Sequence, residues 1–234
     1  MAAVLVSGGV VGIAQPAAAA DVEPIDLVNP FVGTQNFGNT FPGASAPFGM
    51  VQVSPDTGGQ GGYDYKQDSI YGFSQTHLSG VGCGVMGELP VMPTTGAVDS
   101  VDPNAYRSPY SHDDEQASPG YYRVGLKKYD VDAELTATAR TGWQRYTFLH
   151  RFGQRPVQHG QGQPARAGLR GARRRRPHHR GPGACRGFCA GHDEHTVYFS
   201  ATFDRPFQAY GTWEGADPEP GTRDAGETAR TAPG

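Results

Sequence analysis

The sequence predicts an all-β protein built from antiparallel strands, on three observations. Glycine and proline are frequent, with 34 and 19 among 234 residues, which is too many turn formers for a helical bundle or a coiled coil. Apolar and polar residues alternate with period two in several segments. No segment shows a persuasive 3.6-residue amphipathic pattern, and after the first twenty residues no apolar run approaches the ~18 residues that span a bilayer. A helical membrane protein and a collagen-like fibre are therefore excluded.

Residues 1–20 have the pattern of a secretory signal. Small apolar residues fill positions 2–13, and the small-residue stretch Ala17–Ala20 precedes Asp21, as at a signal cleavage site. We therefore expect a secreted, extracellular protein whose true start lies further upstream, with a disordered extension as the alternative. The three cysteines allow at most one disulfide within the chain, and both a Cys83–Cys189 bridge and free buried thiols stay open.

Residues 26–93 are expected to form ordered loops around short strands. Glycine and proline interrupt the apolar runs, for example at Pro42-Gly43 and Gly61-Gly62, and these are turn signals. Long irregular loops are usually functional or disordered. Here they carry eight aromatic residues that we expect to anchor them on a core, namely Phe31, Phe37, Phe41, Phe48, Tyr63, Tyr65, Tyr71 and Phe73.

Period-two patterns predict antiparallel strands later in the chain, with one face toward solvent. Between residues 120 and 148 two sets of apolar residues alternate with polar or small neighbours, namely Tyr122, Val124 and Leu126, then Val131, Ala133, Leu135 and Ala137. The pattern returns at His195–Phe203, and residues 207–213 favour another strand. Residues 214–234 lack an apolar period, so we expect a disordered tail or linker there.

The segment Gly72–Gly84 is the strongest candidate for a binding loop. Its closely spaced glycines allow close backbone approach to a ligand, and Thr76, His77 and Ser79 supply convergent polar groups. The alternative is a tight turn whose polar groups satisfy its own backbone. It is not a phosphate-binding loop, because no Gly-Lys-Ser/Thr follows.

Four motifs in order resemble the N-terminal domain of glycoside hydrolase family 92. They are Val28-Asn29-Pro30-Phe31-Val32-Gly33-Thr34, Thr40-Phe41-Pro42-Gly43-Ala44, Pro47-Phe48-Gly49-Met50-Val51-Gln52-Val53-Ser54-Pro55-Asp56 and Gly72-Phe73-Ser74-Gln75-Thr76-His77-Leu78-Ser79-Gly80. The resemblance covers residues 25–148 and resumes over residues 188–213. It implies a β-sandwich of the galactose-mutarotase type (a supersandwich), which we place at residues 21–213.

The family consists of exo-acting α-mannosidases, and the resemblance implies that sugar binding and acid/base chemistry involve different domains. Calcium would engage sugar hydroxyls, while an acid and a base carboxyl ~6.5–9.5 Å apart would act by inversion. Both carboxyls belong to a helical (α/α)₆ domain that is C-terminal to the sandwich, so we expect this chain to be truncated before its catalytic residues. Calcium ligands cannot be assigned in it.

The sandwich would form one wall of the sugar cleft. We expect Asp64, His77, Ser79 and Cys83 to lie near the sugar. Two other carboxylate groups, Asp113-Asp114-Glu115 and Asp64/Asp68, are interpreted as solvated neighbours in polar loops rather than as an acid/base pair. No Gly-x-Ser-x-Gly motif supports a serine nucleophile.

Residues 149–187 depart from the family pattern. They hold ten of the 20 basic residues, all arginine, and none of the 23 acidic residues. Aromatic residues that would stack on nucleic-acid bases are nearly absent, and the Cys/His spacings fit no familiar zinc site. The composition matches GC-rich codons read out of frame, so we infer compensating frameshifts and an irregular segment that replaces about three or four strands. The sandwich would then be incomplete, and we expect this chain to fold poorly.

The sequence thus predicts the sugar-cleft-forming N-terminal domain of a secreted, calcium-dependent α-mannosidase. Its partners would be α-mannoside glycans and the missing catalytic domain, without nucleic acid or membrane. This chain alone is not expected to hydrolyse a substrate. Two alternatives stay open, namely a non-catalytic carbohydrate-binding module and the non-functional product of a damaged gene.

Overall fold

The computed structural model describes residues 22–80, 86–96, 100–149, 167–175, 195–205, 210–214, 217–221 and 230–233. Strands dominate these ranges, with short helices η1 (Pro24–Leu27), α1 (Pro103–Tyr106) and η2 (His112–Asp114). The strands up to residue 148 are β1 (Ala44–Ser45), β2 (Gln52–Asp56), β3 (Ser69–Ile70), β4 (Gly72–Ser74), β5 (Ser108–Pro109), β6 (Gln116–Ser118), β7 (Tyr121–Leu126), β8 (Val131–Ala137) and β9 (Gly142–Phe148). In these ranges no helix is both long and apolar enough to cross a bilayer. The predicted all-β class is confirmed.

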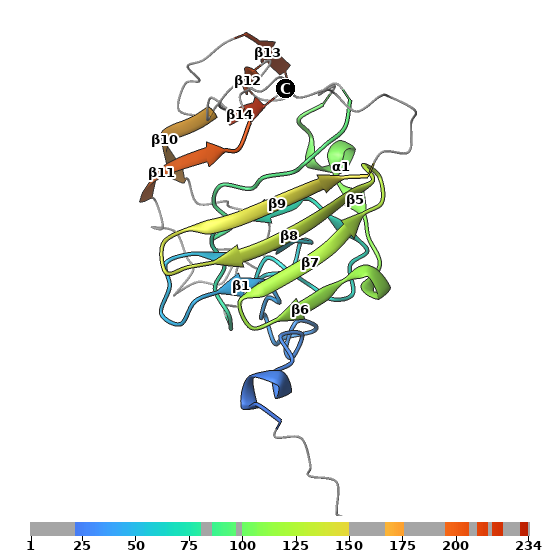
Figure 1. Cartoon of the computed structure of the whole chain (residues 1–234). Coiled ribbons are helices and arrows are strands. Elements are labelled where there is room, and N and C mark those ends of the chain that lie inside the picture. Colours follow the sequence, from blue (N-terminus) through green and yellow to red (C-terminus); the bar gives the residue numbers. More distant parts are fainter. Residues whose placement is uncertain are drawn as a thin grey trace, which may run out of the picture.

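Strands β6, β7, β8 and β9 form one antiparallel sheet in chain order (Figure 1). Alternate residues face the core, as the period-two pattern predicts. The predicted residues Tyr122, Val124 and Leu126 of β7 are at most 1 % exposed, and the same holds for Val131, Ala133 and Leu135 of β8. Their neighbours in sequence face outward, where Glu134 pairs with Arg145 of β9.

A second layer of three strands, in the order β1-β2-β4, packs on the inner face of this sheet. Val53 of β2 and Phe73 of β4 are fully buried, and Phe73 contacts Tyr146 of β9 with ring centroids 6.0 Å apart. Burying each such side chain contributes roughly 1.5–3 kcal/mol. A hydrophobic core, made of side chains from residues 44 to 146, therefore joins the two layers.

The loops between residues 26 and 93 are anchored by only some of the predicted aromatic residues. Tyr63 and Phe73 are buried, whereas Phe37 and Phe48 are 96 % and 107 % exposed. The prediction that all eight aromatics anchor the loops is therefore wrong for these two. Phe48 lies in a turn, with a φ of 55° that few non-glycine residues adopt.

In the described ranges after residue 149 there are five more strands. Strand β10 (Ala167–Arg175) pairs antiparallel with β11 (His195–Phe203), and β12 (Tyr210–Glu214) pairs with both β13 (Asp217–Pro220) and β14 (Arg230–Pro233). Strand β11 confirms the predicted strand, and β12 lies in the segment that favoured one. Two expectations are corrected here, because β10 lies in the supposedly irregular Arg-rich segment, and β13 and β14 lie in the supposed tail. Ladder hydrogen bonds join backbone groups, so they form without a period-two side-chain pattern. The signal-like residues 1–20, Cys185 and Cys189 lie outside the described residues.

Candidate functional site

A cavity of about 240 Å³ lies between two loops of the N-terminal part of the chain. One loop contributes residues 34–39, and the other contributes residues 58–64. The lining residues are Thr34, Asn36, Phe37, Asn39, Gly58, Gly59, Gln60, Tyr63 and Asp64. The volume is below the roughly 300–1,000 Å³ of pockets for drug-sized ligands, so any ligand held in it is small.

The loop between Thr57 and Asp64 is closed at its base and tightly packed at its tip. The Thr57 hydroxyl donates to the Asp64 carbonyl at 3.2 Å and accepts from the Asp64 backbone N–H at 2.7 Å. Gly62 has a φ of +94°, and a Cβ there would lie 2.4 Å from Cδ2 of the His77 ring. A Cβ on Gly61 would lie 2.7 Å from the carbonyl oxygen of Asn39. The glycine pairs therefore let this loop approach both His77 and the other loop.

The loop from Thr34 to Asn39 turns sharply and is tied to the first loop. Asn36 and Asn39 have φ values of 57° and 50°, a region that asparagine tolerates better than most residues. The Tyr65 backbone N–H donates to the Thr34 carbonyl at 2.9 Å. Lys66 Nζ donates to Asn36 Oδ1 at 2.6 Å. These bonds hold the two cavity walls together.

The lining combines the groups that recognise polyhydroxylated ligands. Side-chain amides come from Asn36, Asn39 and Gln60, and a carboxylate comes from Asp64. These groups can donate to and accept from sugar hydroxyls. Phe37 is an exposed aromatic ring at the cavity, and such a ring can pack on the apolar face of a sugar. Hydrogen bonding and apolar packing are thus both available to one ligand.

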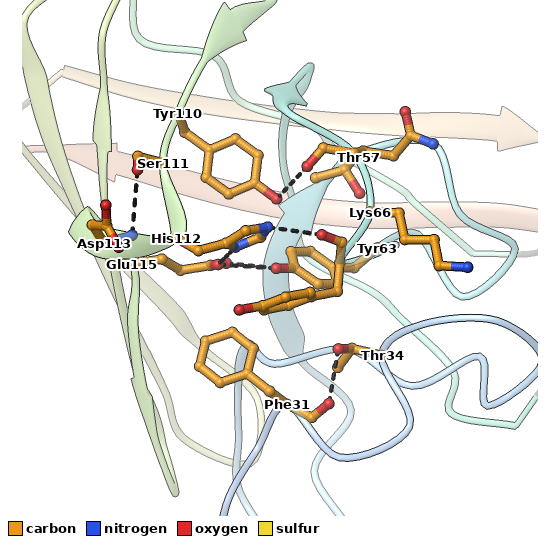
Figure 2. Close-up of polar contacts among 12 residues, drawn as sticks. Phe31, Thr34, Thr57, Tyr63, Lys66, Tyr110, Ser111, His112, Asp113 and Glu115 are labelled. Carbon is orange, nitrogen blue, oxygen red and sulfur yellow. Dashed lines mark hydrogen bonds and ion pairs between the residues drawn. The ribbon is translucent and has the colours of Figure 1, made fainter.

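A buried polar network lies behind the Tyr63 wall (Figure 2). The Tyr63 hydroxyl donates to both carboxylate oxygens of Glu115, at 2.8 and 3.0 Å, and the Tyr122 hydroxyl donates to Oε1 at 2.6 Å. His112 Nδ1 lies 2.6 Å from Oε2 of the same carboxylate. Ser111 caps helix η2, whose turn brings His112 and Glu115 to one side. A buried carboxylate with several donors is well satisfied.

The structure brings only part of the predicted sugar-proximal set to the cavity. Asp64 lines it. His77 is 3 % exposed, with Nδ1 2.8 Å from the Gln52 carbonyl and Nε2 3.1 Å from Asp56 Oδ1, so it supports the loop from behind. Ser79 is exposed, one residue before Gly80, whose N–H donates to the Asn39 carbonyl at 2.8 Å. Cys83 lies outside the described residues.

Sequence reasoning missed the three amide side chains and the Glu115 network. The run Gly58-Gly59-Gln60-Gly61-Gly62 indicated a turn, and its central glutamine was the one available signal for a polar loop tip. Glu115 was interpreted as solvated but is 7 % exposed. This interpretation is wrong, because Tyr63, 52 residues away, and Tyr122 on strand β7 both donate to the carboxylate in the interior.

The calcium that the family resemblance implies stays an expectation for the whole enzyme. Calcium sites need six to eight oxygen ligands, usually with several carboxylates. Within the described ranges no group of three His, Cys, Asp or Glu side chains is placed to hold a metal ion. We therefore derive no step through calcium for these residues.

Comparison with known proteins identifies the family. Residues 27–232 match the glycosyl hydrolase family 92 N-terminal domain, and the chain belongs to this family. An uncharacterized secreted glycosidase of Arthroderma benhamiae is 31 % identical over 147 residues, which are 59 % of this chain and 19 % of that protein.

Solved structures agree with this assignment. A family GH92 α-mannosidase from Bacteroides thetaiotaomicron is 31 % identical, with a TM-score of 0.62 over 88 % of this chain and 30 % of its own. It has also been solved in complex with mannoimidazole. The GH92 glycosyl hydrolase ccman5 is 31 % identical, with a TM-score of 0.67 over 88 % of this chain and 29 % of its own. The chain thus spans less than a third of the length of these relatives.

Proposed function

We propose that this chain forms the sugar-facing wall of the active-site cleft of a secreted α-mannosidase. The observation that carries the proposal is the cavity between residues 34–39 and 58–64, with its amides, carboxylate and aromatic ring, in a chain of family 92. The Bacteroides α-mannosidase that binds mannoimidazole supports a mannose-type ligand. We place Asp64 in contact with sugar hydroxyls and Ser79 near the rim, with His77 supporting the loop.

Hydrolysis is assigned to residues outside the described part of this chain. Inversion requires an acid and a base carboxyl on opposite sides of the glycosidic bond, with room for a water. In the cavity lining the only carboxyl is that of Asp64, so the described lining binds sugar and lacks such a pair. Calcium and the helical acid/base domain belong to the proposal for the whole enzyme.

The test is mannoside binding by the full chain. Methyl α-D-mannopyranoside is titrated while saturation-transfer NMR records its contact with the protein. We expect saturable binding, weakened about tenfold or more by Asp64→Asn, because hydrogen bonds to a charged group contribute roughly 1.5–3 kcal/mol. The matched control is Asp68→Asn, which makes the same change at an exposed residue four positions further along, outside the cavity lining. Equal weakening by both variants would refute the cavity as the sugar site, and absence of binding would refute the proposal for this chain.

A non-catalytic carbohydrate-binding module is the second candidate, because the described lining holds amides and an aromatic ring but a single carboxyl, that of Asp64. A module that binds glycan chains gains affinity with each further sugar contact. A cleft wall that accepts one terminal mannose does not gain affinity from mannose to mannobiose. Stronger mannobiose binding would therefore favour the module.

A further inference from the structure

We propose that the pair formed by His112 and the buried Glu115 positions Asp64 by fixing the two residues that flank it. This inference deepens the proposed function and rests on it, because it takes Asp64 to be a sugar contact. It concerns residues on the loop at helix η2, which are distant in sequence from the cavity walls.

Both neighbours of Asp64 are bonded to this pair. On one side, the Tyr63 hydroxyl donates to the two Glu115 oxygens at 2.8 and 3.0 Å. On the other side, His112 Nε2 lies 2.7 Å from the Tyr65 carbonyl oxygen. The rings of Tyr65 and His112 also stack, with centroids 3.8 Å apart and an interplanar angle of 9°. The pair therefore holds the residue before Asp64 by its side chain and the residue after Asp64 by its carbonyl and its ring.

The hydrogen bonds hold the His112 ring at both of its nitrogens. Nδ1 faces a carboxyl oxygen of Glu115, and Nε2 faces the carbonyl oxygen of Tyr65. The ring therefore links the two residues. The Glu115 side chain is 1 % exposed and that of His112 is 33 % exposed, so the Glu115 end of the link is shielded from solvent.

The two phenols stay protonated donors. Burial, followed by the negative charge of Glu115, raises the pKa of Tyr63 and that of Tyr122 far above the ordinary value of 10.0. Each hydroxyl therefore keeps its proton at neutral pH and donates it to Glu115. Tyr122 belongs to β7 and fixes the carboxylate to the sheet. Tyr63 bonds this fixed carboxylate and itself lines the cavity.

The experiment compares variants of the full chain that each remove one tyrosine hydroxyl. Tyr63→Phe removes the bond to Glu115. Tyr129→Phe removes a part-buried bond of similar length, 2.6 Å to the Tyr106 carbonyl, away from the network. We expect Tyr63→Phe to weaken methyl α-D-mannopyranoside binding about tenfold, since small displacements of positioned groups are costly. Tyr129→Phe lowers the melting temperature comparably and leaves binding within twofold.

A second readout keeps the inference separate from the proposed function. The Asp64 amide donates to Thr57 Oγ1, and its hydrogen exchange can be followed by NMR without sugar. We expect Tyr63→Phe to speed this exchange about tenfold and Tyr129→Phe to leave it unchanged. If the wild-type chain does not bind mannoside, the proposed function fails. The hydrogen exchange of the Asp64 amide then tests by itself whether Tyr63 and His112 position Asp64.

Should Tyr63→Phe fail to fold, His112→Gln replaces it, because the His112 side chain is one-third exposed and bonds the other flank of Asp64. The same weakening and faster exchange are expected. Equal effects of the Tyr129 control, or unchanged binding and exchange in the Tyr63 or His112 variant, would overturn the inference.

Discussion

Substituting Gly62 by alanine tests the packing that shapes the cavity. Gly62 has a φ of +94°, and its missing Cβ leaves the space that the His77 ring fills. That ring cannot easily move aside, because both its nitrogens are bonded, to the Gln52 carbonyl and to Asp56. The single methyl group of Gly62→Ala therefore meets a fixed neighbour.

The expected loss in the free energy of unfolding on Gly62→Ala has two parts. A positive φ costs a residue with a Cβ about 1–2 kcal/mol. A Cβ 2.4 Å from His77 Cδ2 and 2.7 Å from Nε2 adds an overpacking cost of about 1–3 kcal/mol. Gly120 offers the matched control, because its φ is +77° and a Cβ there meets nothing within 4 Å. Gly120→Ala should therefore show only the first part.

The assay is urea unfolding of the full chain with each alanine variant. We expect Gly62→Ala to lower the free energy of unfolding by about 1–3 kcal/mol more than Gly120→Ala. Adding His77→Ala to Gly62→Ala should recover part of the loss, because contacting residues couple by about 0.5–3 kcal/mol in a double-mutant cycle. Equal losses for the two glycines, or simple additivity with His77→Ala, would refute the close packing of His77 on this loop.

Two further predictions concern stability, and two concern the sugar site. The hydrophobic core of residues 44 to 146 predicts a cooperative thermal transition by circular dichroism, in contrast to the sequence-based expectation of poor folding. A gradual, broad loss of signal would support that expectation instead. Hydrogen bonds from Arg145, then Tyr121, lower the pKa of Glu134 from 4.5 to about 2. The ionised Glu134 carboxylate therefore stabilises the fold fully above pH 4.5, and this stabilisation is lost as the pH falls toward 2. The difference in melting temperature between wild type and Glu134→Gln should vanish over that range. A pH-independent difference would contradict the shift. The mannoside titration of Asp64→Asn and the Tyr63→Phe comparison complete the set.

The sheet β6–β9 was predictable from sequence because its pattern is local. Val131, Ala133 and Leu135 alternate with polar residues, and one register places all of them on the buried face. Strands β13 and β14 were not predictable in this way. Their sequence lacks alternation, and they form by pairing with β12.

Part of the predicted site set lies at the candidate cavity, and its contact with sugar stays a prediction. Asp64 was expected near a ligand because the family resemblance places its loop beside the cleft, and the structure places it in the cavity wall. His77 was expected there too, but both its nitrogens are already bonded behind the loop. A sequence shows that a histidine is available, while its bonding partners depend on residues brought together by folding.

The sequence alone was sufficient for the all-β class and for the family, since strand periodicity and ordered motifs are properties of neighbouring residues. Tertiary structure alone determined which polar groups line one cavity and which are buried in support. Glu115 illustrates the reason. In the sequence it ends an acidic run typical of a solvated loop, yet Tyr63 and Tyr122, 52 and 7 residues away, donate to it in the interior. Its burial follows from long-range packing, which no local pattern encodes.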